Sequence, residues 1–479
     1  MNTQIVQLFG LTMLLFAVLI GFTSRWSVFE REDLEDRTAN RRPLIEEQRI
    51  PRGLIRASDG TVIARSEGRG RGEQRTFTRT YPTGPLFSHA VGYSFISRGR
   101  AGVERSRNDE LTGKEDEFAN IFSELQSETR EGKDVTTTLD GDGQRTALQA
   151  LGGRRGSVVA LEPQSGQVRV MVSVPEYDPN LVPERFSELS TDNAKPLFNR
   201  ATQSSYPPGS TFKVVTAAAA LDSGKYKPDS IIDGSSPREV SGVPLANSGG
   251  QDFGPITLTD ALTNSVNTVF AQVGEGIGED TLGNYMQRFG FGQDPPLDYP
   301  DSQMLASGVR NSKGTLVTSG FDVGRVAIGQ GGNEGQIQVS PLQMAMVAGA
   351  VGNGGILMQP RLTERIVSKD GRAEDVKPTR QARVMSRESA GQLTEMMGNV
   401  VEEGTGTAAA LSGIHAGGKT GTAEVDNATA NQAWFIGFAP LDNPRMAIAV
   451  TIERTQGQGG TEAAPIAKQV LESLLGGAA

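Results

Sequence analysis

Residues 207–213, Pro-Pro-Gly-Ser-Thr-Phe-Lys, mark a point where a turn gives way to a helix. Two prolines and a glycine interrupt regular structure, whereas serine is favoured where a helix begins. The residues that follow, as far as Leu221, are apolar nearly all round, and a helix of that kind is buried inside a domain. The pattern therefore predicts a buried helix from Ser210 to about Leu221, with a domain packed around it.

Ser210 and Lys213 lie three residues apart, so they share one face of this helix. A hydroxyl at the positive end of a helix, beside an amine, can be activated as a nucleophile. Burial lowers the pKa of an amine, which would let Lys213 act as a base near neutral pH. A capping serine followed by a surface lysine gives the same letters, so this interpretation needs support from elsewhere in the chain.

Two motifs further along the chain supply that support. Ser265-Val266-Asn267 sits within residues 258–273, which read as helix–turn–helix, and its two polar residues can converge only from a turn. Residues 419–422, Lys-Thr-Gly-Thr, precede a short strand predicted at 423–425. Gly421 lets a substrate backbone approach closely, and the lysine and hydroxyls suit a carboxylate-bearing substrate laid along the strand edge. Each motif alone is weak, but the three in this order are a strong signal.

The amino-acid composition limits which catalytic and metal-binding chemistry the chain can perform. The 479 residues include no cysteine and only two histidines, His89 and His415. Disulfides, thiol catalysis and Cys-ligated zinc or iron–sulfur centres are excluded, and a His-rich metal site is not possible. We therefore expect no metal and no cofactor. The net charge of −9 argues against a nucleic-acid partner.

Hydropathy and the pattern of predicted secondary structure divide the chain into three parts. Residues 5–22 are nearly all apolar and are followed by no small-residue cleavage site, which predicts an uncleaved transmembrane anchor within residues 1–24. The flanking charges do not set its orientation. Residues 25–150 read as a mixed α/β pedestal module without a catalytic constellation, and residues 151–479 as the catalytic domain.

Local patterns predict the main elements of these parts. In the first 150 residues we expect a charged stalk at 30–50, a hairpin around Asp59-Gly60, a flexible loop at 68–72, a polar helix at 115–129, a strand at 132–139 and a helix at 140–151. In the catalytic domain we expect hairpins at 157–174 and 433–453 and a final helix at 465–475. An α+β fold follows, with an antiparallel sheet packed by helices and the first and last strands of the domain in one sheet.

The chain resembles class B penicillin-binding proteins, in particular the actinobacterial penicillin-binding protein A type. Besides the three motifs, the resemblance rests on blocks spread over nearly the whole length: PRGLI (51–55), YPPG (206–209), GQG (329–331), SPLQMA (340–345), GTGTA (404–408) and WFIGF (434–438). Gln432 departs from the pattern, because many members have histidine there. The resemblance implies a penicillin-binding/β-lactamase-like transpeptidase domain.

The resemblance also implies a reaction, the cross-linking of peptidoglycan stem peptides by D,D-transpeptidation. Ser210 would attack the D-Ala-D-Ala carbonyl and form an acyl-enzyme, and Lys213 would take its proton. Ser265 would relay a proton to the leaving amine, with Lys419 holding that relay polarised. β-Lactams would acylate Ser210 as dead-end mimics.

Substrate binding is implied for the remaining motif residues. Asn267 would bind the substrate's amide side chain, and Thr420 and Thr422 would hold its terminal carboxylate beside Gly421. The backbone N–H groups of Ser210 and Thr422 would form the oxyanion hole. The resemblance further implies a single-pass protein of the cell membrane, with the catalytic domain outside the cytoplasm. A polytopic glycan polymerase, or other proteins of division or elongation, would be its partner.

Several alternatives stay open at this point. A D,D-carboxypeptidase, a β-lactam sensor and a β-lactamase share the same three motifs. Residues 413–420 (GIHAGGKT) fit the phosphate-binding pattern G-x-x-x-x-G-K-T, although the strand before it and the helix after it are not predicted. A hydrolase built on Ser248 and His415 is a further alternative, weakened because no strand is predicted to lead into Ser248.

Overall fold

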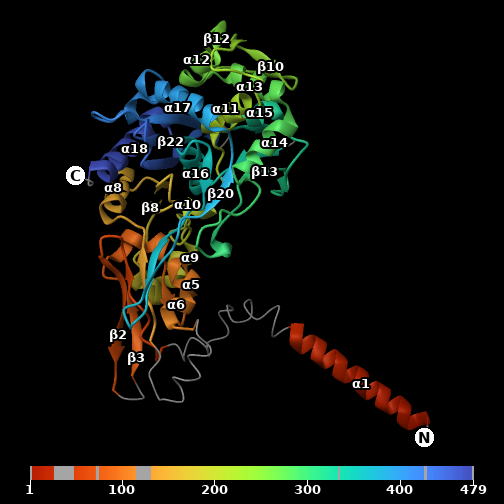
Figure 1. Ribbon diagram of the computed structural model, residues 1–479, viewed down its shortest axis with the longest axis vertical. Coiled ribbons are helices and arrows are strands. Elements are labelled where there is room, and N and C mark those ends of the chain that lie inside the picture. Colours follow the sequence, from red (N-terminus) through yellow and green to blue (C-terminus); the bar gives the residue numbers. More distant parts are fainter. Residues whose placement is uncertain are drawn as a thin grey trace.

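The computed structural model describes residues 3–25, 48–71, 75–114, 131–332, 335–425 and 429–476. Most of the expected stalk at 30–50 and all of the expected polar helix at 115–129 lie outside the described residues. The two largest sheets are one of five long strands packed between helices and one of six shorter strands built largely from the N-terminal residues (Figure 1). The α+β class is confirmed.

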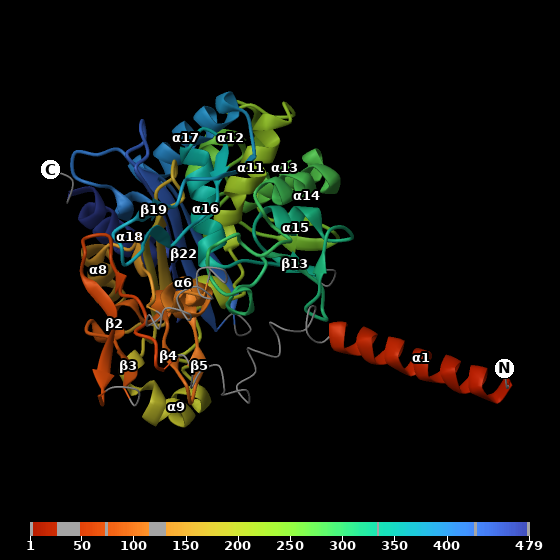
Figure 2. The same ribbon diagram turned by 60° about the horizontal axis from the view of Figure 1, so that its bottom comes forward.

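Helix α1, Thr3–Ser24, contains the whole of the apolar segment predicted at 5–22. Its side chains are exposed, and it is long and apolar enough to cross a membrane by length and composition. Figures 1 and 2 show it projecting away from the rest of the chain. A membrane anchor is compatible with this helix.

A five-stranded antiparallel sheet forms the centre of the C-terminal part, in the order β21-β22-β23-β7-β8. Its strands are β7 Gly156–Leu161, β8 Val168–Val174, β21 Gly417–Val425, β22 Ala430–Ala439 and β23 Met446–Thr455. β7 pairs with β23, with Val159 opposite Ala449. The prediction that the first and last strands of the domain share one sheet is therefore confirmed.

Helices cover both faces of this sheet, which explains why its strands are apolar almost without alternation. On one face, α8 (Gly141–Leu151) and α18 (Gly459–Gly476) pack against alternate strand residues such as Val158 and Val450. α18 begins six residues before the expected start at Pro465, because Ala463 and Ala464 are buried against the same face.

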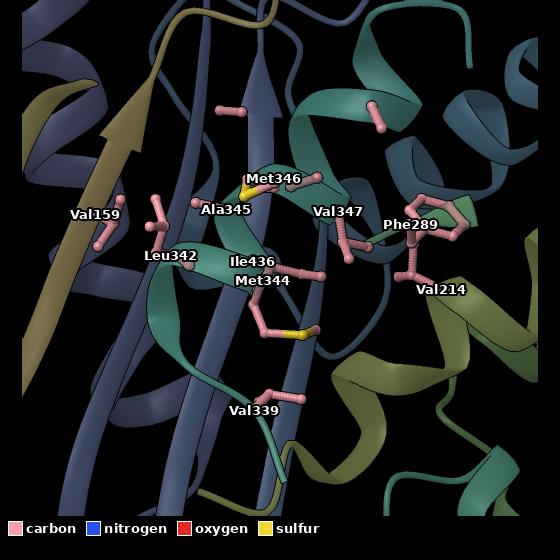
Figure 3. Packing of buried hydrophobic residues seen from close by; sticks show 14 of the residues in the cluster. Val159, Val214, Phe289, Val339, Leu342, Met344, Ala345, Met346, Val347 and Ile436 are labelled. Carbon is pink, nitrogen blue, oxygen red and sulfur yellow. The ribbon is translucent and has the colours of Figure 1, made fainter. Parts of the chain in front are cut away.

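The opposite face of the sheet is covered by α16 (Pro341–Gly352), a helix that is buried nearly all round. Leu342 and Met344 lie over Val159 and Ile436 of the sheet (Figure 3). α11 (Lys213–Asp222) and α17 (Arg387–Glu402) belong to the same cluster. The predicted burial of the helix after Ser210 is confirmed, because Phe212 and every residue from 214 to 220 are fully buried.

A six-stranded sheet, in the order β19-β18-β6-β1-β2-β3, forms the smaller part. Its strands are β1 Ile55–Arg56, β2 Val62–Arg69, β3 Thr76–Thr80, β6 Asp134–Thr137, β18 Thr363–Val367 and β19 Ala373–Asp375. The hairpin around Asp59-Gly60 is confirmed, since β1 and β2 pair antiparallel. The flexible loop expected at 68–72 is wrong for Gly68 and Arg69, which pair with β3 and so belong to the sheet.

The two parts exchange elements, which bears on where one domain ends and the next begins. β18 and β19 come from the C-terminal part of the chain but extend the N-terminal sheet. Conversely, α8 lies almost wholly before the boundary at 150 but packs on the five-stranded sheet. The boundary at 150 stays a prediction.

Glu104 organises the interior of the N-terminal part. Its fully buried carboxylate pairs with the guanidinium groups of both Arg79 and Arg52, and Tyr81 donates its hydroxyl to it. Burial alone would raise the pKa of Glu104, but the two cations outweigh it and lower that pKa. The carboxylate therefore stays ionised between two arginines.

Candidate active site

Ser210 stands at the start of α11, although not in the α-helix itself. Residues Gly209–Phe212 form a tighter 3₁₀ turn, and the α-helix begins at Lys213. The expectation of one α-helix from Ser210 is corrected in this respect. Ser210 is partly exposed, whereas Thr211 and Phe212 beside it are buried.

Close backbone contact with β21 explains the position of this turn. Gly209 has φ +52°, and a Cβ atom there would lie 2.8 Å from the carbonyl oxygen of Thr422 and 3.1 Å from its nitrogen. Only glycine tolerates both the conformation and the approach. The Pro-Pro-Gly turn thus places Ser210 directly against the Lys-Thr-Gly-Thr strand.

Lys213 connects the first motif to the second. Its fully buried Nζ donates to the carbonyl oxygen of Ser265 at 2.7 Å and to Oδ1 of Asn267 at 2.7 Å. The same Nζ lies 3.4 Å from the Ser265 hydroxyl oxygen and 5.6 Å from the centre of the Phe270 ring. The side chains of both motifs therefore meet at one amine.

The second motif forms the turn that the sequence predicts. α12 (Leu258–Thr263) ends just before it, and α13 (Asn267–Ile277) begins at its asparagine. Ser265 has φ +60°, a left-handed conformation uncommon for a residue other than glycine. That conformation aims both its carbonyl and its hydroxyl at Lys213, and Asn267 is held from behind by a hydrogen bond from Nδ2 to Ala246 O at 3.1 Å.

The third motif lies within β21 rather than before it. The short strand expected at 423–425 begins at Gly417, because residues 417–425 pair continuously with β22. β21 is an edge strand of its sheet, so one side is open for a further strand or an extended peptide. Lys419 is fully buried and its Nζ donates to Thr420 O at 3.2 Å.

Burial changes the protonation of both lysines. It lowers the pKa of Lys419 to about 7. It also lowers the pKa of Lys213 to well below its ordinary value, and the positive charge of Lys419 adds to that shift. Desolvation penalises an ammonium ion and not a neutral amine, so burial favours the neutral form of Lys213.

The two threonines of the third motif differ in their partners. The hydroxyl oxygen of Thr420 lies 2.6 Å from that of Thr405, and the hydroxyl of Thr422 accepts a hydrogen bond from Gly459 N at 3.1 Å. Thr405 was not singled out as a site residue from the sequence. Its only signal was the Gly-Thr-Gly-Thr block at 404–407, whose side-chain directions the letters do not reveal.

The phosphate-loop and Ser–His alternatives lack the required surroundings. Residues 413–420 run directly into β21 and are followed by no helix, so they cannot form a phosphate-binding loop. A short strand, β11 (Val243–Leu245), does precede Ser248, contrary to expectation. Ser248 is nevertheless exposed, and His415 lines a separate cavity beside Leu441. Among the described residues, no group of three or more histidine or acidic side chains could hold a metal ion.

A partly exposed serine followed by a buried lysine, with a Ser-x-Asn turn on one side and a Lys-Thr-Gly strand on the other, is the arrangement of a serine acyl-transfer enzyme. Residues 156–472 match the penicillin binding protein transpeptidase domain, and residues 52–135 match the penicillin binding protein A dimerisation domain. The chain therefore belongs to the penicillin-binding protein transpeptidase family.

Two mycobacterial proteins are similar in sequence to this chain over its full length. Peptidoglycan D,D-transpeptidase PbpA of Mycolicibacterium smegmatis is 32% identical over 508 residues, covering 99% of each chain. PbpA of Mycobacterium tuberculosis is 32% identical over 512 residues, covering 100% of each.

Solved structures show the same fold. Penicillin-binding protein A from M. tuberculosis, as its ceftriaxone acyl-enzyme complex, has a TM-score of 0.80 at 30% identity, covering 90% of this chain and 100% of that one. The D,D-transpeptidase domain of a peptidoglycan glycosyltransferase from Eggerthella lenta has a TM-score of 0.78 at 33% identity, covering 89% and 99%.

Proposed function

We propose that this protein cross-links peptidoglycan stem peptides and that Ser210 is the residue acylated by both substrate and β-lactam. The observation that carries the proposal is the convergence of three sequence-distant motifs on the buried amine of Lys213 and the strand beside it. The names of the relatives support the reaction, and the acyl-enzyme complexes of the M. tuberculosis protein support the serine chemistry.

Lys213 is the base in this proposal. A neutral amine has two N–H groups and one lone pair, and the two short hydrogen bonds to Ser265 O and Asn267 Oδ1 occupy both N–H groups. The lone pair remains for the proton of Ser210. As that proton leaves, Ser210 Oγ bonds to the carbonyl carbon of the penultimate D-Ala, and a tetrahedral intermediate forms.

Ser265 and Lys419 complete the proton transfer. The Ser265 hydroxyl, 3.4 Å from Lys213 Nζ, passes its proton to the leaving nitrogen as the C–N bond breaks and D-Ala departs, and it takes in return the proton that Lys213 received from Ser210. Lys419 keeps this hydroxyl polarised from the buried side of β21. An amine of a second stem peptide then displaces Ser210 from the acyl-enzyme.

The edge of β21 binds the substrate. Thr420 and Thr422 hold the terminal carboxylate through their hydroxyls, Gly421 lets the substrate backbone approach, and Asn267 holds its amide side chain. The N–H groups of Ser210 and Thr422 stabilise the oxyanion, and the contact between Gly209 and the Thr422 backbone supports their proximity.

We also propose that this chemistry takes place outside the cytoplasm. α1 anchors the protein in the membrane by a single pass, and the module at 25–150 acts as a pedestal beneath the catalytic domain. We propose a polytopic glycan polymerase as the partner, contacted through α1 and the pedestal. Co-purification of such a polymerase with the full chain, and its loss when α1 is exchanged for an unrelated membrane-spanning helix, is the expected result. Retention of the polymerase would contradict this part.

The central experiment is labelling of the protein with a fluorescent penicillin. Wild type and Ser223→Ala, a serine at the other end of α11, should be labelled, whereas Ser210→Ala should not and Lys213→Ala should label far more slowly. Labelling of Ser210→Ala would refute the assignment. Hydrolysis of penicillin within seconds would instead identify a β-lactamase.

A further inference from the structure

A cavity of about 980 Å³ opens beside the candidate active site, at the end of the five-stranded sheet. One wall contains Glu424 and Val425, which end β21 two and three residues after Thr422. Another contains Tyr206 and Pro207, which lead into the turn that carries the nucleophile. Both walls continue from the site, so the cavity adjoins it.

Only one direction along β21 is open to a bound peptide. Residues 416–421 are buried, and a Cβ atom on Gly417 would already meet the side chains of Leu441 and Phe438 within 3.1 Å. Glu424, at the other end, is exposed. A peptide whose terminal carboxylate lies at Thr420 and Thr422 therefore extends its earlier residues toward Val425. At about 3.3 Å per residue, these residues reach the cavity within two or three positions.

Cationic side chains outnumber carboxylates in the described lining of this cavity. Among the described residues, its lining contains four cations, Arg155, Lys195, Arg200 and Arg454, and two carboxylates, Glu424 and Glu453. Arg200 and Glu453 neutralise each other at 2.8 Å, and their side chains are only 4% and 15% exposed. Tyr206 also donates its hydroxyl to Glu453. Apart from this pair, the described lining residues carry more positive than negative charge, in a protein whose net charge is −9.

Two of these cationic residues have a strained backbone conformation. In the described part of the chain, four residues other than glycine have positive φ, and one of them is Ser265 of the candidate site. Two of the others are Lys195, at +53°, and Arg454, at +50°. The carbonyl of Lys195 is held by Arg200 Nη1 at 3.3 Å, so the buried ion pair fixes the strained turn. Strain of this kind persists where side-chain direction matters for function.

A second cavity, of about 400 Å³, shares Arg155, Glu453 and Arg454 with the first. The two together form a groove across the end of the sheet, from the end of β21 to the residue before β7.

We infer that this groove binds a carboxylate carried by the stem peptide on a residue N-terminal to its D-Ala-D-Ala end, an inference that rests on the function proposed above. Arg155 and Lys195 supply the charge that recognises the carboxylate, and Glu424 at the mouth opposes it. The groove thus sets which stem peptides are used, while acylation itself depends on the three motifs.

The test compares two synthetic peptides that end in D-Ala-D-Ala and differ only in a free carboxylate or a carboxamide on the preceding residue. Release of D-Ala is measured for the full-length protein in detergent, for Arg155→Gln/Lys195→Gln, and for a matched control, Arg145→Gln/Lys468→Gln. The control removes one arginine and one lysine from the exposed surfaces of α8 and α18. Labelling by penicillin is measured in parallel.

Wild type and control should prefer the carboxylate peptide in kcat/KM by roughly 2- to 5-fold, the range expected for partly exposed charge pairs. The groove variant should lose this preference through KM while its penicillin labelling stays unchanged. Glu424→Gln should increase the preference, and high salt should reduce it.

Equal use of the two peptides by wild type would overturn the inference, as would a groove variant that keeps the preference or loses penicillin labelling in parallel. A wild-type protein that penicillin does not label would overturn the proposed function itself, so the two failures are distinguishable.

Discussion

The hydroxyl oxygens of Thr405 and Thr420 lie 2.6 Å apart, so a hydrogen bond joins the loop after α17 to the strand that carries the third motif. The backbone N–H of Thr405 also donates to Thr263 O at 3.3 Å, two residues before Ser265. One exposed threonine therefore connects the segments that carry the second and third motifs. We interpret it as a positioning residue for the Thr420 hydroxyl.

Replacing Thr405 by valine should slow acylation by penicillin about 3- to 10-fold, because a hydrogen bond of this kind contributes about 0.5–1.5 kcal/mol. Thr405→Ser, which keeps the hydroxyl, should restore the rate. Thr407→Val, in the same block, is the matched control and should behave as wild type. A purely steric role would leave Thr405→Ser as slow as Thr405→Val.

Acylation should depend on pH through Lys213. The neutral amine is the active form, and burial lowers the pKa of Lys213, so the rate should rise with pH and level off well below the ordinary lysine value of 10.5. Stopped-flow measurement of penicillin acylation between pH 5 and 9 checks this. Lys213→Arg, which cannot lose its proton, should be inactive throughout; a rate that falls as pH rises would rule Lys213 out as the base.

Stability should also rise with pH through Lys419. Its pKa is about 7 in the folded protein and near 10.4 in an unfolded chain, so the unfolded state binds more protons between these values. The free energy of unfolding should therefore increase from pH 7 to about pH 10, by up to about 1.4 kcal/mol per pH unit. Lys213 acts in the same direction.

The Lys419→Met variant should show a shallower dependence than wild type in urea unfolding over this range, while Lys468→Met, at an exposed position, should follow wild type. Identical slopes for wild type and Lys419→Met would mean that Lys419 is charged in the fold.

Removing the buried carboxylate of the N-terminal part should be costly. Glu104→Gln leaves the guanidinium groups of Arg52 and Arg79 without their counter-ion, and breaking a buried pair in this way costs about 3–5 kcal/mol. The matched control, Glu67→Gln, breaks an exposed pair with Arg65 and should cost less than about 1 kcal/mol. Thermal unfolding of the two variants checks the difference, and comparable losses would contradict the role given to Glu104.

Much of the fold was predictable because the signals are local. The Pro-Pro-Gly turn, the helix–turn–helix around Ser265 and the two hairpins of the main sheet each depend on residues a few positions apart. Burial on both faces of a sheet erases alternation, which is why the strand that carries Lys419 was expected to begin only at 423. Pairing of β18 with β6 joins residues more than 200 apart, and no local pattern signals it.

By itself, the sequence determined the apolar N-terminal helix, the α+β class, the order of the three motifs and the residue types available for chemistry, because spacing and composition act through neighbouring residues. The tertiary structure alone decided that Lys213 meets Ser265 and Asn267, that both buried lysines have lowered pKa values, that Thr405 touches Thr420, and that Arg155 and Lys195 line one groove. These relationships depend on desolvation and on distances between groups far apart in the chain, which exist only once the sheet and its helices have packed.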